Sequence, residues 1–136
     1  MDPIRLFSII SWIALPTVMF GGYSLLGLMA RGNTWLTSFR ATYFRAGHAH
    51  AGVLLILSLL YYTYLAQTTF SGGLKLAACI VLLVGLLAQS GGFFLHMLVG
   101  KQGRFSAGTL VTILGALLLA FAVLLLAYGL LVARPL

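Results

Sequence analysis

One stretch sets the class of this protein: RAGHAHAG at residues 45–52, which leads into the apolar run VLLILSLL at residues 53–60. Two of the three histidines in the chain, His48 and His50, lie in this stretch, at the predicted mouth of a membrane-spanning helix. Ionisable side chains inside a bilayer are costly, and they mark functional sites by default. The stretch therefore predicts a membrane protein and also locates its candidate site.

The composition of the whole chain agrees with a membrane protein. The 136 residues are 62% hydrophobic and only 7% charged, whereas a soluble domain carries about a quarter charged residues. The net charge of +7 comes from eight Lys and Arg residues against one acid, Asp2. We interpret this excess as a signal for membrane orientation and lipid headgroup binding. The basic residues are scattered over short loops and form no patch, which argues against nucleic acid as a partner.

Four apolar segments are each long enough to cross a bilayer. Short connections make consecutive helices antiparallel neighbours. We therefore predict an all-α integral membrane protein, an antiparallel up-down four-helix transmembrane bundle that forms a single domain over residues 1–136. The predicted helices span about 4–30, 44–67, 74–99 and 106–132.

Three local features refine this prediction. Pro16 and the Gly21-Gly22 pair predict a kink in the first segment. The tyrosines at 61, 62 and 64 predict an interfacial aromatic belt at the end of the second segment. Small residues four apart, Ala88 with Gly92 and Ala116 with Ala120, predict close helix packing.

The loops also predict an orientation. One side of the membrane collects five basic residues and the other collects three, together with Asp2. The positive-inside rule then places the first side in the cytoplasm, both termini outside, and the histidines near the cytoplasmic side of a multi-pass protein. The first side holds Arg31, Arg40, Arg45, Lys101 and Arg104; the second holds Arg5, Lys75 and Arg134.

The third histidine, His96, is predicted to lie in the same leaflet as the other two. His48 follows Arg45 by three residues, and His96 precedes Lys101 by five. At a rise of 1.5 Å per residue these positions lie roughly 5 and 8 Å below the flanking charges. Because the second and third segments are antiparallel, all three histidines are expected on adjacent helices at one level.

Helix geometry separates His48 from His50. Two residues turn a helix by about 200°, so only one of the two can face His96. A flat macrocycle needs a small residue four positions before its ligand, where the side chain leans. Ala46 meets this need for His50 and Gly92 meets it for His96. Phe44, four positions before His48, does not.

We therefore predict that His50 and His96 are the axial ligands of one tetrapyrrole, a b-type haem, between the second and third segments. The side chains of Arg45, Arg104 or Lys101 are predicted to pair with its propionates. The corresponding function is electron transfer by a small redox subunit of a larger membrane complex or homo-oligomer, with membrane lipid around it and quinone as a candidate partner. Whether the chain is itself an enzyme stays open.

Other assignments of the histidines stay open as well. A chlorophyll-type pigment satisfies the same spacing but needs one histidine per pigment. A copper or zinc ion bound by His48, His50 and His96 requires a broken helix at Gly47. Alternatively, all three histidines are structural and bond to carbonyls, waters or lipid phosphates, in which case the chain is a non-catalytic accessory subunit.

The His48-Ala49-His50 pattern resembles a helix of the catalytic subunit of haem–copper oxidases, where two histidines at this spacing bind haems from opposite faces. The resemblance covers about six residues. This chain lacks the further histidines and helices of that family, so the resemblance implies no oxidase activity. It shows only that histidines on opposite faces of one helix can each hold a cofactor.

The shortage of acidic residues excludes several other classes of function. None of the four predicted segments contains Asp or Glu. Carboxylate-gated proton pumping and carboxylate-based cation transport are therefore disfavoured. Hydrolysis by paired carboxylates and by a Ser-His-Asp triad is excluded for the same reason.

Overall fold

The computed structural model describes residues 2–133 and contains four helices. Each is long and apolar enough to cross a membrane, which confirms the all-helical prediction. The helices are α1 (Pro3–Ala30), α2 (Ser38–Ala66), α3 (Gly72–Val99) and α4 (Ala107–Val132). Arg134, which the predicted orientation used, lies outside the described residues.

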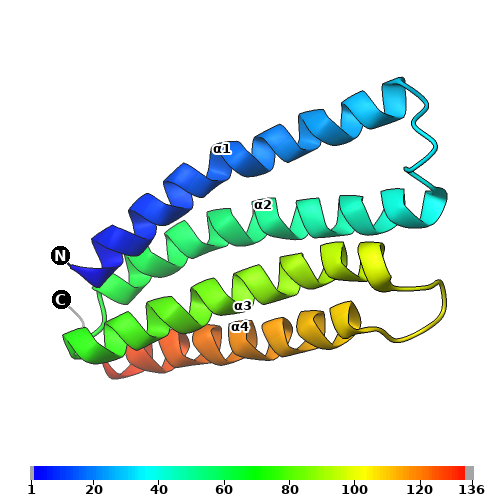
Figure 1. Ribbon diagram of the computed structural model, residues 1–136. Coiled ribbons are helices and arrows are strands. Elements are labelled where there is room, and N and C mark those ends of the chain that lie inside the picture. Colours follow the sequence, from blue (N-terminus) through cyan, green and yellow to red (C-terminus); the bar gives the residue numbers. More distant parts are fainter. Residues whose placement is uncertain (1, 134–136) are drawn as a thin grey trace.

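The four helices lie side by side along one long axis (Figure 1). The loops 31–37 and 100–106 lie at one end of the molecule. The loop 67–71, the start of α1 and the end of α4 lie at the other end. The α1 helix is continuous through Pro16, and it diverges from α2 toward loop 31–37 (Figure 1). We call the end that holds loops 31–37 and 100–106 the histidine end.

The second helix begins six residues earlier than the predicted start near residue 44. Thr37 is its N-cap, and its hydroxyl accepts a hydrogen bond from the Arg40 backbone N–H at 3.3 Å. Such a cap satisfies one of the free N–H groups of the first turn. The predicted start was wrong because the polar residues Arg40 and Arg45 indicate a loop by hydropathy alone. Arginines can lie in a helix while their guanidinium groups reach the surface. His48 and His50 thus lie roughly 15 and 18 Å inside α2 at 1.5 Å per residue.

The closest helix pair is α3 with α4, and glycines line its seam. A Cβ atom at Gly92 would overlap Thr112, and one at Gly115 would overlap the backbone nitrogen of Gln89. A seven-residue spacing keeps small residues on one face of a helix along a left-handed crossing. This stripe comprises Ala78, Gly85 and Gly92 on α3, and Gly108, Gly115, Ala122 and Gly129 on α4.

The predicted packing pairs are half correct. Gly92 lies in the α3–α4 seam, but Ala116 and Ala120 are exposed. Spacing by four fits several faces of a helix, and the seven-residue repeat beginning at Gly108 selects the buried one.

The predicted tyrosine belt is wrong for Tyr61 and Tyr62 and stays a prediction for Tyr64. Tyr61 and Tyr62 are 3% and 1% exposed, whereas Tyr64 is 49% exposed. The Tyr61 hydroxyl donates to the Ala122 carbonyl at 3.0 Å, so this ring joins α2 to α4 in the core and does not face a membrane interface. The neighbouring core also contains Cys79, which is fully buried as a small packing residue.

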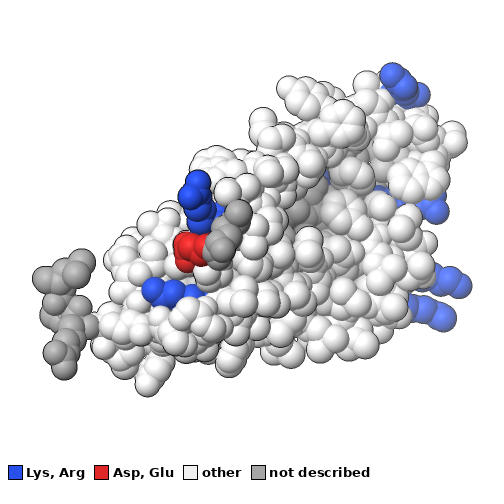
Figure 2. Space-filling model, turned by 60° about the vertical axis from the view of Figure 1, so that its left-hand side comes forward, with Lys and Arg blue, Asp and Glu red and all other residues white. Residues whose placement is uncertain are grey.

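Charged side chains gather at the two ends of the bundle and leave its middle uncharged. Figure 2 shows basic groups at the histidine end, and further basic groups beside the acid near the opposite end. The sides of the helices between these ends are apolar and largely exposed, with many large hydrophobic side chains at the surface. This distribution is what a bundle solvated by lipid requires.

Candidate histidine site

His48 faces the first helix. A Cβ atom built on Gly22 would lie 3.1 Å from Nε2 of His48, and one built on Gly21 would lie 3.4 Å from Nδ1. The Gly21-Gly22 pair therefore gives the His48 ring its room. Among residues 2–133 neither ring nitrogen of His48 has a hydrogen-bond partner. Sequence reasoning treated the two glycines only as a helix interruption and missed this contact.

His50 faces the third helix, on the opposite side of α2. Its ring centroid lies 4.7 Å from that of Phe93 in α3. Its Nδ1 lies 2.8 Å from the carbonyl oxygen of Ala46, one turn earlier. A protonated Nδ1 donates to this carbonyl, which fixes the ring and leaves the lone pair on Nε2. The side chain is half-buried.

His96 is buried near the end of α3, with 4% of its surface exposed. Its Nδ1 lies 2.7 Å from the hydroxyl of Ser106 and 3.2 Å from that of Thr109, both at the start of α4. Its Nε2 is also buried and has no hydrogen-bond partner within residues 2–133. Burying a polar atom without a partner costs about 1–3 kcal/mol, so this nitrogen requires an explanation.

Two aromatic rings stand between His50 and His96. Tyr43 contacts His96 at 4.3 Å between ring centroids, and Phe93 lies 6.5 Å from Tyr43. Phe93 in turn packs against His50 with the two ring planes inclined at 36°, so the four side chains form one continuous row of rings. The structure thus brings both predicted ligands to the α2–α3 interface but does not place them on a common empty space.

The two small residues predicted to clear a macrocycle have other neighbours. Gly92 lies against Thr112 and the backbone of Gly108 in α4, so its missing side chain allows the close α3–α4 contact. The Ala46 carbonyl holds Nδ1 of His50. Both residues position the predicted ligands, but neither faces an open cavity between α2 and α3.

The predicted propionate partners lie at the histidine end and have exposed side chains. The guanidinium of Arg45 lies 3.6 Å from the sulfur of Met29, and Arg104 is in loop 100–106. Neither has an acidic partner there, because the only acid, Asp2, caps the start of α1 at the opposite end. Both guanidinium groups are thus free to pair with anionic groups.

The three histidines do not form a metal site together. The described residues 2–133 contain no group of three His, Cys, Asp or Glu side chains that could hold one ion. The reason is geometric: α2 is unbroken at Gly47, so His48 and His50 point to different neighbouring helices. The predicted three-histidine copper or zinc site therefore has no support.

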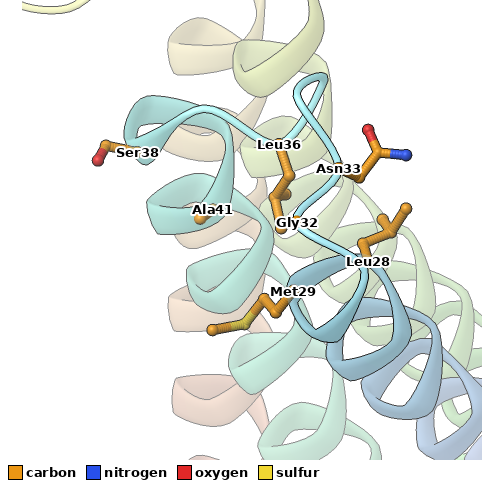
Figure 3. A pocket seen from close by; sticks show the side chains of 7 residues that line it. All are labelled: Leu28, Met29, Gly32, Asn33, Leu36, Ser38 and Ala41. Atoms are coloured by element: carbon orange, nitrogen blue, oxygen red, sulfur yellow. The ribbon is translucent and has the colours of Figure 1, made fainter.

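A separate hollow of about 280 Å³ lies where loop 31–37 joins α1 to α2 (Figure 3). None of its lining residues is titratable, and the polar ends of Asn33 and Ser38 point outward in Figure 3. Gly32, with a φ of 58°, makes the turn that closes this loop. The hollow offers no group for acid–base or redox chemistry. It is lined by Leu28, Met29, Gly32, Asn33, Leu36, Ser38 and Ala41.

The sequence matches no protein-family model, and no curated protein or solved structure matches it either.

Proposed function

We propose that this chain is a small integral membrane protein that binds a b-type haem, or a related tetrapyrrole, through His50 and His96. It would cross the membrane four times as an antiparallel up-down bundle and transfer electrons as a subunit of a larger membrane complex. Two imidazoles on neighbouring helices are sufficient to ligate such a group, and no carboxylate is required.

The observation that carries this proposal is the buried, unpartnered Nε2 of His96. Histidines that bind metals typically have their other ring nitrogen held by a hydrogen bond, which fixes the tautomer and the ring orientation. Ser106 and Thr109 hold Nδ1 of His96 in this way. Coordination to iron would satisfy the one nitrogen of this ring that now lacks a partner.

His50 has the same pattern on the facing helix. Its Nδ1 is held by the Ala46 carbonyl at 2.8 Å, which leaves Nε2 as the available ligand atom. Both predicted ligands therefore present Nε2 and anchor Nδ1. Binding between them requires the Tyr43 and Phe93 rings to rotate away, since these rings now fill the space. The exposed side chains of Arg45, Lys101 and Arg104 at the same end supply positive charge for propionates.

The distribution of basic residues supports an orientation for this protein. Five basic residues lie at the histidine end, against two, Arg5 and Lys75, among the described residues at the other end. We place the histidine end in the cytoplasm by the positive-inside rule, with both termini outside. Lipid covers the exposed apolar helix faces except where other membrane subunits or further copies of the chain bind.

A second candidate function, a structural accessory subunit, is favoured by one observation. The row of rings from His50 through Phe93 and Tyr43 to His96 is already well packed. In this alternative the histidines only join helices, as His96 joins α3 to α4 through Ser106.

Absorbance spectroscopy separates the two candidates. The protein is purified in mild detergent, titrated with haemin, and measured in the oxidised and the dithionite-reduced states. A Soret band with α and β bands that sharpen on reduction supports haem, and far-red absorbance of the protein as isolated supports a chlorophyll-type pigment. A folded protein that stays colourless, takes up no haemin and contains no metal by elemental analysis overturns the haem proposal and leaves the structural subunit.

A further inference from the structure

His48 is the histidine that the proposed haem site does not use, and its surroundings are those of a second binding site. The Gly21-Gly22 pair keeps α1 free of side chains opposite the ring. A Cβ atom at Gly22 would stand 3.1 Å from Nε2, closer than an ordinary van der Waals contact. The two glycines therefore make room for the His48 ring itself, and this ring also lines an adjoining hollow.

A hollow of about 190 Å³ adjoins this ring and is partly open to the surface. A cavity of about 150 Å³ is large enough to bind benzene, so this hollow accepts one six-membered ring with small substituents. Three helices contribute its walls: Thr17, Val18 and Gly21 from α1, Phe44, His48 and Ala51 from α2, and Phe94 from α3.

The chemistry of the walls defines the ligand. Phe44 and Phe94 meet edge to face at 5.3 Å between ring centroids, and they present apolar surfaces to a flat ring. None of the lining residues carries a permanent charge. The polar groups are the His48 imidazole and the Thr17 hydroxyl, which donates to the Ala14 carbonyl at 2.6 Å. A neutral imidazole offers one N–H donor and one acceptor nitrogen.

These features describe a neutral, flat, six-membered ring with an oxygen that accepts a hydrogen bond. We propose that the hollow between α1 and α2 binds the head group of a membrane quinone, with the His48 N–H donating to one quinone carbonyl. The apolar chain of the quinone leaves through the open side into the lipid that covers the exposed apolar faces of α1 and α2.

This inference deepens the proposed function, because a quinone is an electron partner suited to a haem subunit. It uses different residues, however. The haem proposal depends on His50 and His96 at the α2–α3 interface, and the quinone site depends on His48 and the glycines of α1. The two proposals can therefore fail separately.

Equilibrium binding of tritiated decylubiquinone to the purified full-length protein tests the quinone site. Two variants should weaken binding at least tenfold: His48→Leu, which removes the donor, and Gly22→Val, whose side chain would displace the His48 ring because a Cβ atom there already stands 3.1 Å from Nε2. Gly27→Val is the matched control in the same helix, because a Cβ atom there meets nothing within 4 Å. The affinity of this variant for decylubiquinone should stay within twofold of the wild-type value. His48→Gln keeps an N–H donor and should bind more tightly than His48→Leu.

The outcomes distinguish this inference from the haem proposal. The variants His50→Ala and His96→Ala should keep decylubiquinone binding whether or not the protein is coloured. A colourless wild-type protein that binds decylubiquinone saturably would overturn only the haem proposal. Loss of this binding in His48→Leu and Gly22→Val would support the quinone site. Absence of saturable binding to folded wild-type protein, or binding that both variants leave unchanged, overturns the quinone site. Because Gly22→Val can disturb folding, each sample is first checked for a single peak in gel filtration.

Discussion

The Ser106 hydroxyl lies 2.7 Å from Nδ1 of His96, and the same oxygen accepts the backbone N–H of Gly108 at 3.1 Å. One side chain thus caps α4 and orients an imidazole of α3. The contact holds the His96 ring between the start of α4 and the aromatic side chains of α2, where the Tyr43 ring lies 4.3 Å away between centroids. Ser106, the residue immediately before α4, therefore sets the orientation of the candidate ligand His96.

Ser106→Ala should destabilise the protein more than the loss of a helix cap alone. Ser71 is the matched control, since it caps α3 by accepting from the Leu74 N–H at 3.3 Å and touches no histidine. Loss of either cap should lower the free energy of unfolding by about 1 kcal/mol. Ser106→Ala should lose about another 1 kcal/mol, because His96 loses its nearer partner. Unfolding in mixed SDS and mild detergent measures both values, and equal losses would contradict the double role of Ser106.

The close packing of α3 against α4 predicts different stabilities for substitutions at the adjacent residues Gly91 and Gly92. Gly92→Ala should destabilise the protein by about 1–3 kcal/mol, because the new methyl group overlaps Thr112 and forces the helices apart. Gly91→Ala is the control, because its Cβ meets nothing within 4 Å. It should leave stability unchanged or raise it by up to about 1 kcal/mol through helix propensity. The same unfolding assay applies, and a loss of similar size in both variants would show that the seam lies elsewhere.

The orientation is testable with single cysteines, because the natural Cys79 is fully buried. Gln102→Cys places a thiol in the exposed loop 100–106, and Thr69→Cys places one in loop 67–71 at the other end. A membrane-impermeant maleimide added to intact cells should label Thr69→Cys at once. Gln102→Cys should be labelled only after the cells are permeabilised. The reverse pattern would put the histidine end outside the cell.

Most of the fold could be predicted from hydropathy, because a segment that crosses lipid must be long, apolar and helical. Three helices begin within two residues of the predicted positions. The second does not, because Arg40 and Arg45 lowered the hydropathy of its first turns. A signal for its true start was present in the sequence, since Thr37 is a favourable N-cap residue.

The candidate site could be predicted only in part. The 200° between His48 and His50 follows from helix geometry, and the structure has one ring against α1 and the other against α3. The sequence could not show whether Gly92 faces a macrocycle or a neighbouring helix, because a small residue is suitable for either contact. The role of Ser106 was accessible from sequence: Ser106 and Thr109 form a capping box before an apolar run, close to His96 along the chain.

The central claim is that His50 and His96 together hold a tetrapyrrole, and a reduced-minus-oxidised absorbance spectrum tests it most directly. The spectrum is recorded after haemin titration for wild type, for the double variant His50→Ala/His96→Ala, and for His48→Ala as the matched control. We predict sharp α and β bands in wild type, their loss in the double variant, and their retention in His48→Ala. A colourless wild type, a double variant that keeps the bands, or a His48→Ala protein that loses them would contradict the account.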